Sequence, residues 1–206
     1  MHEVLPGVFH WVTIHDHLDT QVSSYYLDGP QGAAAIDPRV PDEGLDWFAG
    51  RQPPEHVFLT NRHHYRHSDR FVEAFGCTVW CHRAGLHEFT RGEVVTGFDF
   101  GAQLPAGVEA VAVGAICEEE TALYIPWARA MAFADGLVRA GFDGPLGFVP
   151  DFLLGDDPEG VKDGLCAAVD RSLERDFDHL LFAHGRPWIN GGRGALRRFV
   201  ESRGAG

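Results

Sequence analysis

The stretch that most constrains this chain is residues 59–68, which read LTNRHHYRHS and hold three histidines and two arginines. The apolar run that leads into it, residues 56–60, is typical of a buried strand, so the polar residues are expected at the strand's C-terminal end. In α/β proteins, ligands bind at that end of the strands. The stretch therefore predicts a ligand-binding loop, and its imidazoles make a metal ion one candidate ligand.

Composition limits what this loop can belong to. The chain has 206 residues, 45% hydrophobic and 23% charged, which suits one globular domain over residues 1–206. The formal net charge of −13 argues against a nucleic-acid partner, because phosphate binding depends on Lys and Arg. The N-terminus has no basic region or apolar run of signal-peptide length, and no segment approaches about 20 consecutive apolar residues. We therefore expect a soluble cytoplasmic protein without a membrane partner.

The cysteines and histidines refine this expectation. The four cysteines show no paired C-x-x-C spacing, so neither a zinc ribbon nor a disulfide framework is indicated. The 12 histidines favour a metal without locating it. Of these, His15 and His17 are interpreted as surface or packing residues.

Short apolar runs separated by turn residues predict the order of the elements. Strands are predicted over residues 4–12, 23–27, 33–37, 78–81, 107–113, 121–126, 128–134 and 178–183. Helices are predicted over residues 42–48, 68–75 and 194–203, and a further helix begins at Asp157-Pro158. In that helix, apolar residues recur every four positions from Val161 to Leu173 and predict a core-facing stripe. Residues 94–100 are ambiguous between strand and loop.

The segment 136–155 is rich in glycine and proline yet carries many large apolar side chains. A solvated linker would not need them, so we expect this segment to form either the wall of a pocket or a subunit contact. The second alternative would make the protein a homodimer.

Polar residues follow several of these predicted strands and suggest a layered α/β sandwich. The landmarks, in chain order, are Asp37, the loop 60–67, Ala134-Asp135 and Ala183-His184-Gly185. With these landmarks the whole chain resembles the metallo-β-lactamase fold superfamily. That family has Gly-Asp where this chain has Ala134-Asp135, and Gly-His-Gly where this chain has Ala183-His184-Gly185. The resemblance implies an α/β fold, or α+β in four layers, built as an αβ/βα sandwich of two mixed β-sheets flanked by helices. It places the metal loops along one edge between the sheets.

The loop departs from the family's His-x-His-x-Asp-His motif. Counting back from His67 as the last histidine places Arg62 at the first ligand, His64 at the second and Arg66 at the aspartate. Counting forward from Thr60 instead places Asn61, His63, Tyr65 and Arg66 at those four positions. The first register is preferred because it keeps two ligands rather than one.

A second departure lies between two predicted strands, at residues 114–121. Here the family usually has Pro-Gly-His-Thr, and the histidine position falls near Ile116, which cannot ligate a metal. The acidic run 118–120 beside it is interpreted as solvated turn residues. Asp37 is expected to be a structural hydrogen-bond acceptor behind the loop rather than a catalyst.

The resemblance then implies a ligand count. The family's first metal site takes three histidines, and because only His64 remains here, that site is expected to be empty. The second site keeps His67, Asp135 and His184 as three of its four ligands. Two imidazoles and a carboxylate suit one zinc, iron or manganese ion, which would polarise the carbonyl of a small ester, thioester or amide. His64 would add a ligand or carry a proton.

The two arginines support an alternative without a metal. A guanidinium beside a divalent ion is repelled by it, whereas Arg62 or Arg66 beside Asp135 would form a favourable ion pair. The protein would then be a non-catalytic, metal-free descendant that binds a small anionic molecule or a protein partner. In either alternative Arg62 and Arg66 are the candidate residues for an anionic substrate or ligand.

Overall fold

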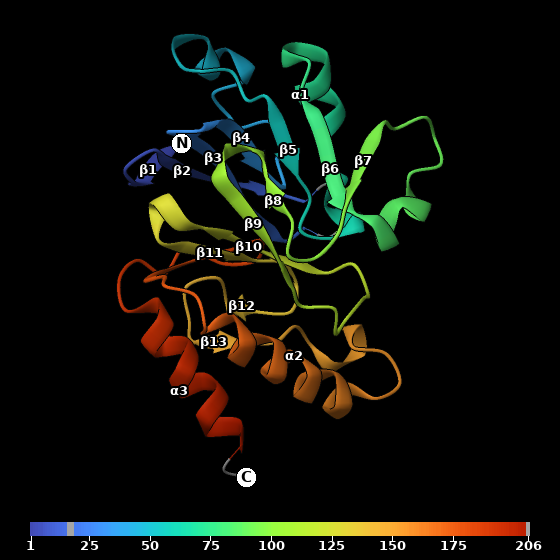
Figure 1. The fold of residues 1–206 in the computed structure, drawn as a ribbon, viewed down its shortest axis with the longest axis vertical. Helices are drawn as coiled ribbons and strands as arrows, with labels where there is room; N and C mark the ends of the chain where they lie inside the picture. The colour runs from blue at the N-terminus through green and yellow to red at the C-terminus, as the bar shows by residue number, and fades with distance from the viewer. Residues whose placement is uncertain (16–18, 205–206) are drawn as a thin grey trace.

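Two mixed β-sheets lie face to face between outer layers of helices (Figure 1). The computed structural model describes residues 1–15 and 19–204, so His17 lies outside the described residues. The first sheet has the order β1 His2–Leu5, β2 Val8–Ile14, β3 Gln21–Gly29, β4 Gly32–Ile36, β5 His56–Phe58, β6 Thr78–His82 and β7 Val95–Phe98. Strands β1 to β4 pair antiparallel, and β4 to β7 pair parallel.

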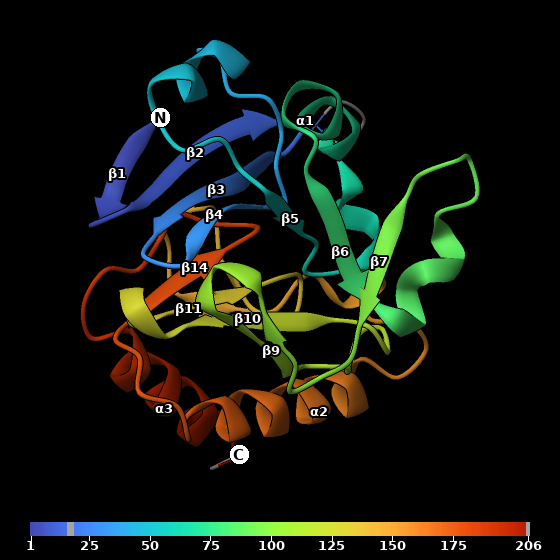
Figure 2. The same cartoon turned by 45° about the horizontal axis from the view of Figure 1, so that its top comes forward.

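The second sheet is mixed as well. Its order is β14 His179–Phe182, β11 Ala130–Phe133, β10 Thr121–Ile125, β9 Val108–Ala112 and β8 Gln103–Leu104. Strands β8 to β11 pair antiparallel, while β14 lies parallel beside β11 (Figure 2). The short strands β12 Val138–Arg139 and β13 Leu146–Gly147 form a separate hairpin. Because β11 and β14 are parallel neighbours, the loops after them leave the sheet at the same edge.

The helices cover the outer faces. Helix α1 Ser68–Phe75 lies on the first sheet, whereas α2 Pro158–Ser172 and α3 Gly192–Gly204 lie on the second (Figure 1). In the described ranges, six 3-10 helices occupy the connections: η1 Leu45–Gly50, η2 Arg62–Tyr65, η3 Arg83–Glu88, η4 Pro105–Gly107, η5 Pro126–Ala128 and η6 Asp151–Leu153. No helix among the described residues is long and apolar enough to cross a membrane.

Local chemistry explains where the helices begin and end. Helix α2 begins as predicted, since the Asp157 carboxylate accepts a hydrogen bond from the Gly160 backbone N–H at 3.0 Å and Pro158 fills the first helical position. Helix α1 ends at Gly76, whose φ of 69° is the left-handed conformation that glycine adopts without strain. Both boundaries were therefore readable from the sequence.

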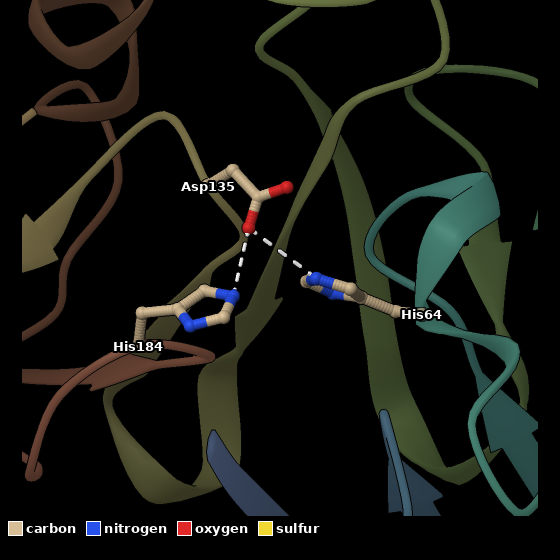
Figure 3. Close-up of side chains that lie close together, drawn as sticks. All are labelled: His64, Asp135 and His184. Atoms are coloured by element: carbon tan, nitrogen blue, oxygen red, sulfur yellow. Dashed lines mark ion pairs between the residues drawn. The ribbon is translucent and has the colours of Figure 1, made fainter. Parts of the chain in front are cut away.

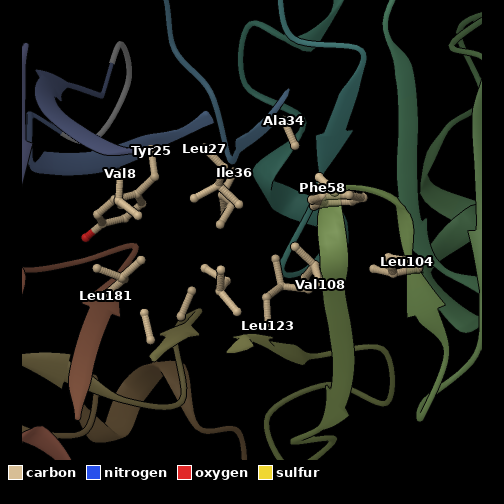
Figure 4. Close-up of a cluster of buried hydrophobic side chains, with 14 of the residues drawn as sticks. Val8, Tyr25, Leu27, Ala34, Ile36, Phe58, Leu104, Val108, Leu123 and Leu181 are labelled. Carbon is tan, nitrogen blue, oxygen red and sulfur yellow. The ribbon is translucent and has the colours of Figure 1, made fainter. Parts of the chain in front are cut away.

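Apolar clusters hold the layers together. Between the sheets, side chains such as Leu27 and Ile36 point toward Leu123 and Leu181 of the opposite sheet (Figure 4). The Tyr25 hydroxyl joins the sheets by donating to the Phe182 carbonyl and accepting from the Phe182 N–H, each at 2.9 Å. Two further clusters pack the outer helices onto their sheets. The predicted four-layer sandwich is thus confirmed.

Some local predictions were wrong. The predicted strand 4–12 is two strands, because the chain turns at Gly7 with a φ of 74°. The predicted helix 42–48 is the 3-10 helix η1, which begins at Leu45. The role of the segment 136–155 as a pocket wall or a subunit contact stays a prediction; within it, Leu137 is buried in the cluster beneath α2, while Phe152 is 82% exposed.

Candidate functional site

His64, Asp135 and His184 meet at the edge between the two sheets (Figure 3). His64 lies in η2 after β5, Asp135 follows β11, and His184 follows β14. His64 Nε2 lies 3.3 Å and His184 Nε2 3.0 Å from the same carboxylate oxygen, Asp135 Oδ1. One nitrogen or oxygen from each residue falls within 4.8 Å of the others, so the three side chains could hold a metal ion together.

His64 is held between two carboxylates. Its Nδ1 lies 2.9 Å from Asp37 Oδ2 and 2.9 Å from Thr60 Oγ1, while Nε2 faces Asp135. Burial lowers the pKa of this imidazole, but the charges of Asp37 and Asp135 outweigh burial and raise the pKa to about 9. Without a metal, His64 is therefore an imidazolium at neutral pH. A metal at Nε2 would take the place of one proton, as metal binding at histidine requires.

Asp37 lies behind the loop, as predicted, and is 1% exposed. Its carboxylate accepts hydrogen bonds from the Thr60 backbone N–H at 2.9 Å and from the Thr60 hydroxyl at 2.5 Å. Burial raises the pKa of this carboxyl group, but His64, Arg66 and Thr60 outweigh that effect and lower the pKa below its ordinary value. Asp37 is thus an ionised acceptor that orients His64.

Asp135 is the shared partner of the cluster. Besides the two imidazoles, it accepts a hydrogen bond from Asn61 Nδ2 to Oδ2 at 2.7 Å. Burial raises the pKa of this carboxyl group, but His64 and His184 hold the pKa well below its usual range. The forward register places Asn61 at the first ligand position of the motif; in the structure its side-chain amide instead orients the carboxylate that the histidines contact.

His67, the fourth predicted metal ligand, does not join this group. Its Nδ1 accepts a hydrogen bond from the Val40 backbone N–H at 3.0 Å, and the His67 backbone N–H donates to the Pro38 carbonyl at 3.1 Å. Of the adjacent histidines, His64 is buried in the cluster and His63 is exposed. His64 is therefore the histidine of the pair that faces the cleft.

Arg66 does not form the expected ion pair with Asp135. Within residues 1–15 and 19–204, the ion-pair partners of Asp135 are His64 and His184. Arg66 Nη1 instead donates to the carbonyl oxygens of Ser23 at 2.7 Å and Asp37 at 2.8 Å. Its Nη2 is buried without a hydrogen-bond partner among the described residues.

Arg62 points away from Asp135. Its Nη1 pairs with the Glu119 carboxylate, and its Nε lies 3.6 Å from Glu88 Oε2. The expectation of an Arg62–Asp135 pair was therefore wrong, because the guanidinium is already engaged by two acidic side chains.

The interpretation of residues 118–120 as solvated turn residues was wrong for two of them. Glu119 is 2% and Glu120 1% exposed. Glu120 Oε1 accepts a hydrogen bond from the Gly136 N–H at 2.5 Å, and burial together with the charge of Asp135 raises the pKa of Glu120 to about 8. The sequence carried no signal for this burial, because adjacent charged residues are normally solvated.

Comparison with solved structures identifies the architecture. A metallo-β-lactamase family protein from Thermus thermophilus is 17% identical, with a TM-score of 0.69 over 98% of this chain and 81% of that chain. A metallo-β-lactamase from Pontibacter korlensis is 16% identical, with a TM-score of 0.68 over 97% of each chain. The chain has the metallo-β-lactamase fold. A protein solved in a di-iron-bound form shares this fold at 20% identity, with a TM-score of 0.68 over 91% of this chain and 97% of that chain.

No family model and no curated protein matches the sequence. At these identities the metallo-β-lactamase fold is what the solved structures share with this chain, and the site must be interpreted from its own residues. The cluster lies at the sheet edge where the resemblance placed the metal loops.

Proposed function

We propose that this protein binds one divalent metal ion through His64, Asp135 and His184 and hydrolyses a small acyl compound. The observation that carries the proposal is the convergence of two imidazole Nε2 atoms on one carboxylate oxygen, at 3.3 and 3.0 Å. Two imidazoles and a carboxylate are a donor set that zinc accepts, and it also suits iron or manganese. A single ion is proposed because the described residues offer this one group of three or more donors.

The residues behind the donors support the same function. The Asp37 carboxylate lies 2.9 Å from His64 Nδ1, so Nε2 is directed toward the proposed ion, an arrangement common behind metal-binding histidines. Asn61 Nδ2 donates a hydrogen bond to Asp135 Oδ2, so the other carboxylate oxygen, Oδ1, faces the imidazoles. When bound, the ion would act as a Lewis acid that polarises the carbonyl of an ester, thioester or amide.

Hydrolysis of a panel of small esters, thioesters and amides by the zinc-, iron- or manganese-loaded protein tests this proposal. His184→Ala should abolish turnover by removing one donor. His63→Ala is the matched control, because His63 is exposed beside His64 and should retain wild-type rates. Equal activity in the His184→Ala and wild-type proteins would contradict the proposal, and so would no turnover of any class by the loaded wild-type protein.

A second candidate is a metal-free protein that binds a small anionic molecule at the same cleft. It is favoured by Arg66, whose buried Nη2 lacks a hydrogen-bond partner in the described part of the chain. A carboxylate or phosphate group that reached this nitrogen would complete its hydrogen bonding. Calorimetric titration of the chelator-treated protein with acetate and inorganic phosphate tests it. Binding that Arg66→Ala abolishes supports this candidate, and no binding of either anion rejects it.

A further inference from the structure

Glu120 has a buried carboxyl group, and only one of its two oxygens has a hydrogen-bond partner among the described residues. The residue is 1% exposed, and its Oε1 accepts from the Gly136 backbone N–H at 2.5 Å. Its Oε2 is buried and has no hydrogen-bond partner among the described residues. Burying a carboxyl group in this way costs free energy, and an apolar side chain of similar size would avoid the cost. The position of Glu120 therefore calls for an explanation.

Glu120 contacts the turn that carries Asp135. Gly136 directly follows Asp135, the residue shared by both imidazoles of the cluster. A Cβ atom on Gly136 would lie 2.8 Å from Glu120 Oε1 and 2.6 Å from Leu165 Cδ2, so the carboxyl group lies directly against the backbone of this turn. A side chain at position 136 would require the Glu120 carboxyl group and the Leu165 side chain to shift.

The residue after Glu120 is hydrogen-bonded to the loop that carries His64. The backbone N–H of the next residue, Thr121, donates to the Thr60 carbonyl at 2.8 Å, and Thr60 itself contacts His64 and Asp37. The Glu120 N–H donates to the Cys117 carbonyl at 3.1 Å. The chain at residues 120–121 thus contacts the Asp135 turn through the Glu120 carboxyl group and the His64 loop through the Thr121 backbone.

We propose that Glu120 is a positioning residue for the metal centre, acting through its hydrogen bond to Gly136 to set the direction of the Asp135 carboxylate. The inference rests on the proposed function of the cluster. Glu120 is not itself a ligand in this arrangement, because it does not belong to the group whose donor atoms lie within 4.8 Å of one another. Residues that orient metal ligands in this way typically change metal affinity by about 10- to 100-fold when they are replaced.

Three variants test the role. Glu120→Gln keeps an oxygen acceptor and the side-chain shape, Glu120→Leu keeps most of the volume without an acceptor, and Glu120→Ala removes both. Zinc affinity is measured by competition with a chromophoric chelator. We expect Glu120→Leu and Glu120→Ala to bind zinc at least about 10-fold more weakly, and Glu120→Gln to remain within about threefold of the wild type. If Glu120→Ala does not fold, the zinc affinities of Glu120→Leu and Glu120→Gln are compared instead.

The second readout is hydrogen exchange of the Gly136 amide, followed by NMR in the metal-free protein. Exchange should become at least about 10-fold faster in Glu120→Leu and stay near the wild-type rate in Glu120→Gln. Glu118→Ala is the matched control, because Glu118 is exposed in the same acidic run and should change neither readout.

The outcomes separate the two proposals. A wild-type protein that binds neither zinc, iron nor manganese rejects the proposed function, while Gly136 exchange still decides whether Glu120 holds the turn. Unchanged exchange in Glu120→Leu overturns the positioning role. Equal losses of zinc affinity in Glu120→Gln and Glu120→Leu also overturn it, because Glu120→Gln keeps the acceptor for the Gly136 N–H and should keep its effect.

Discussion

His64 makes the stability of the metal-free protein depend on pH. Burial lowers the pKa of its imidazole, but Asp37 and Asp135 outweigh burial and raise the pKa from its ordinary 6.5 to about 9. In the unfolded chain the pKa returns to its ordinary value, so between these two pH values the folded state binds one more proton than the unfolded state. The stabilisation is fully present below the lower value and is lost as the pH rises through the higher one. The loss is about 3 kcal/mol, because one pKa unit corresponds to about 1.4 kcal/mol.

Urea unfolding of chelator-treated protein between about pH 6 and about pH 10 measures this loss. The free-energy difference between the wild type and His64→Gln should shrink by about 3 kcal/mol across that range, since the variant lacks the titrating group. His63→Gln is the matched control and should follow the wild type. If the difference in free energy of unfolding between the wild type and His64→Gln stays constant within about 1 kcal/mol, His64 does not lie between two carboxylates as described.

Three further predictions concern stability at neutral pH and are measured by the same unfolding assay. Asp37→Asn should cost about 3–5 kcal/mol, because it removes one partner of a buried charged pair, whereas the exposed Asp42→Asn should stay within about 0.5 kcal/mol of the wild type. Arg62→Ala should also cost about 3–5 kcal/mol by leaving Glu119 buried and unpaired, yet zinc affinity measured by chelator competition should not change. Leu165→Ala should cost about 2–5 kcal/mol by opening a cavity under α2. A loss of stability below about 1 kcal/mol in any of these three variants would contradict the contact assigned to that residue.

The layers of the fold could be predicted because they follow from local patterns. Apolar runs bounded by turn residues located most strands, and the Asp157-Pro158 start and Gly76 end are chemical signals that act within one turn of helix. The break at Gly7 was missed because the residues on both sides of it are compatible with one strand.

The site was only partly predictable, because side-chain direction in an irregular loop does not follow from spacing. Arg66 has a φ of 48° and a ψ of −114°, a backbone conformation that non-glycine residues rarely adopt. The chain turns there, so the His67 imidazole faces Val40, while His64 enters the cluster. Glu120 was missed for a related reason, because adjacent acidic residues are normally solvated and only the tertiary contact with Gly136 explains its burial.

The central claim is that His64, Asp135 and His184 hold one divalent ion. It is tested most directly by elemental analysis of protein purified without chelator, with His184→Ala prepared in parallel. The account predicts about one zinc, iron or manganese ion per wild-type chain and a metal content well below that in the variant. A wild-type content far below one ion per chain, or an unchanged content in His184→Ala, would contradict it.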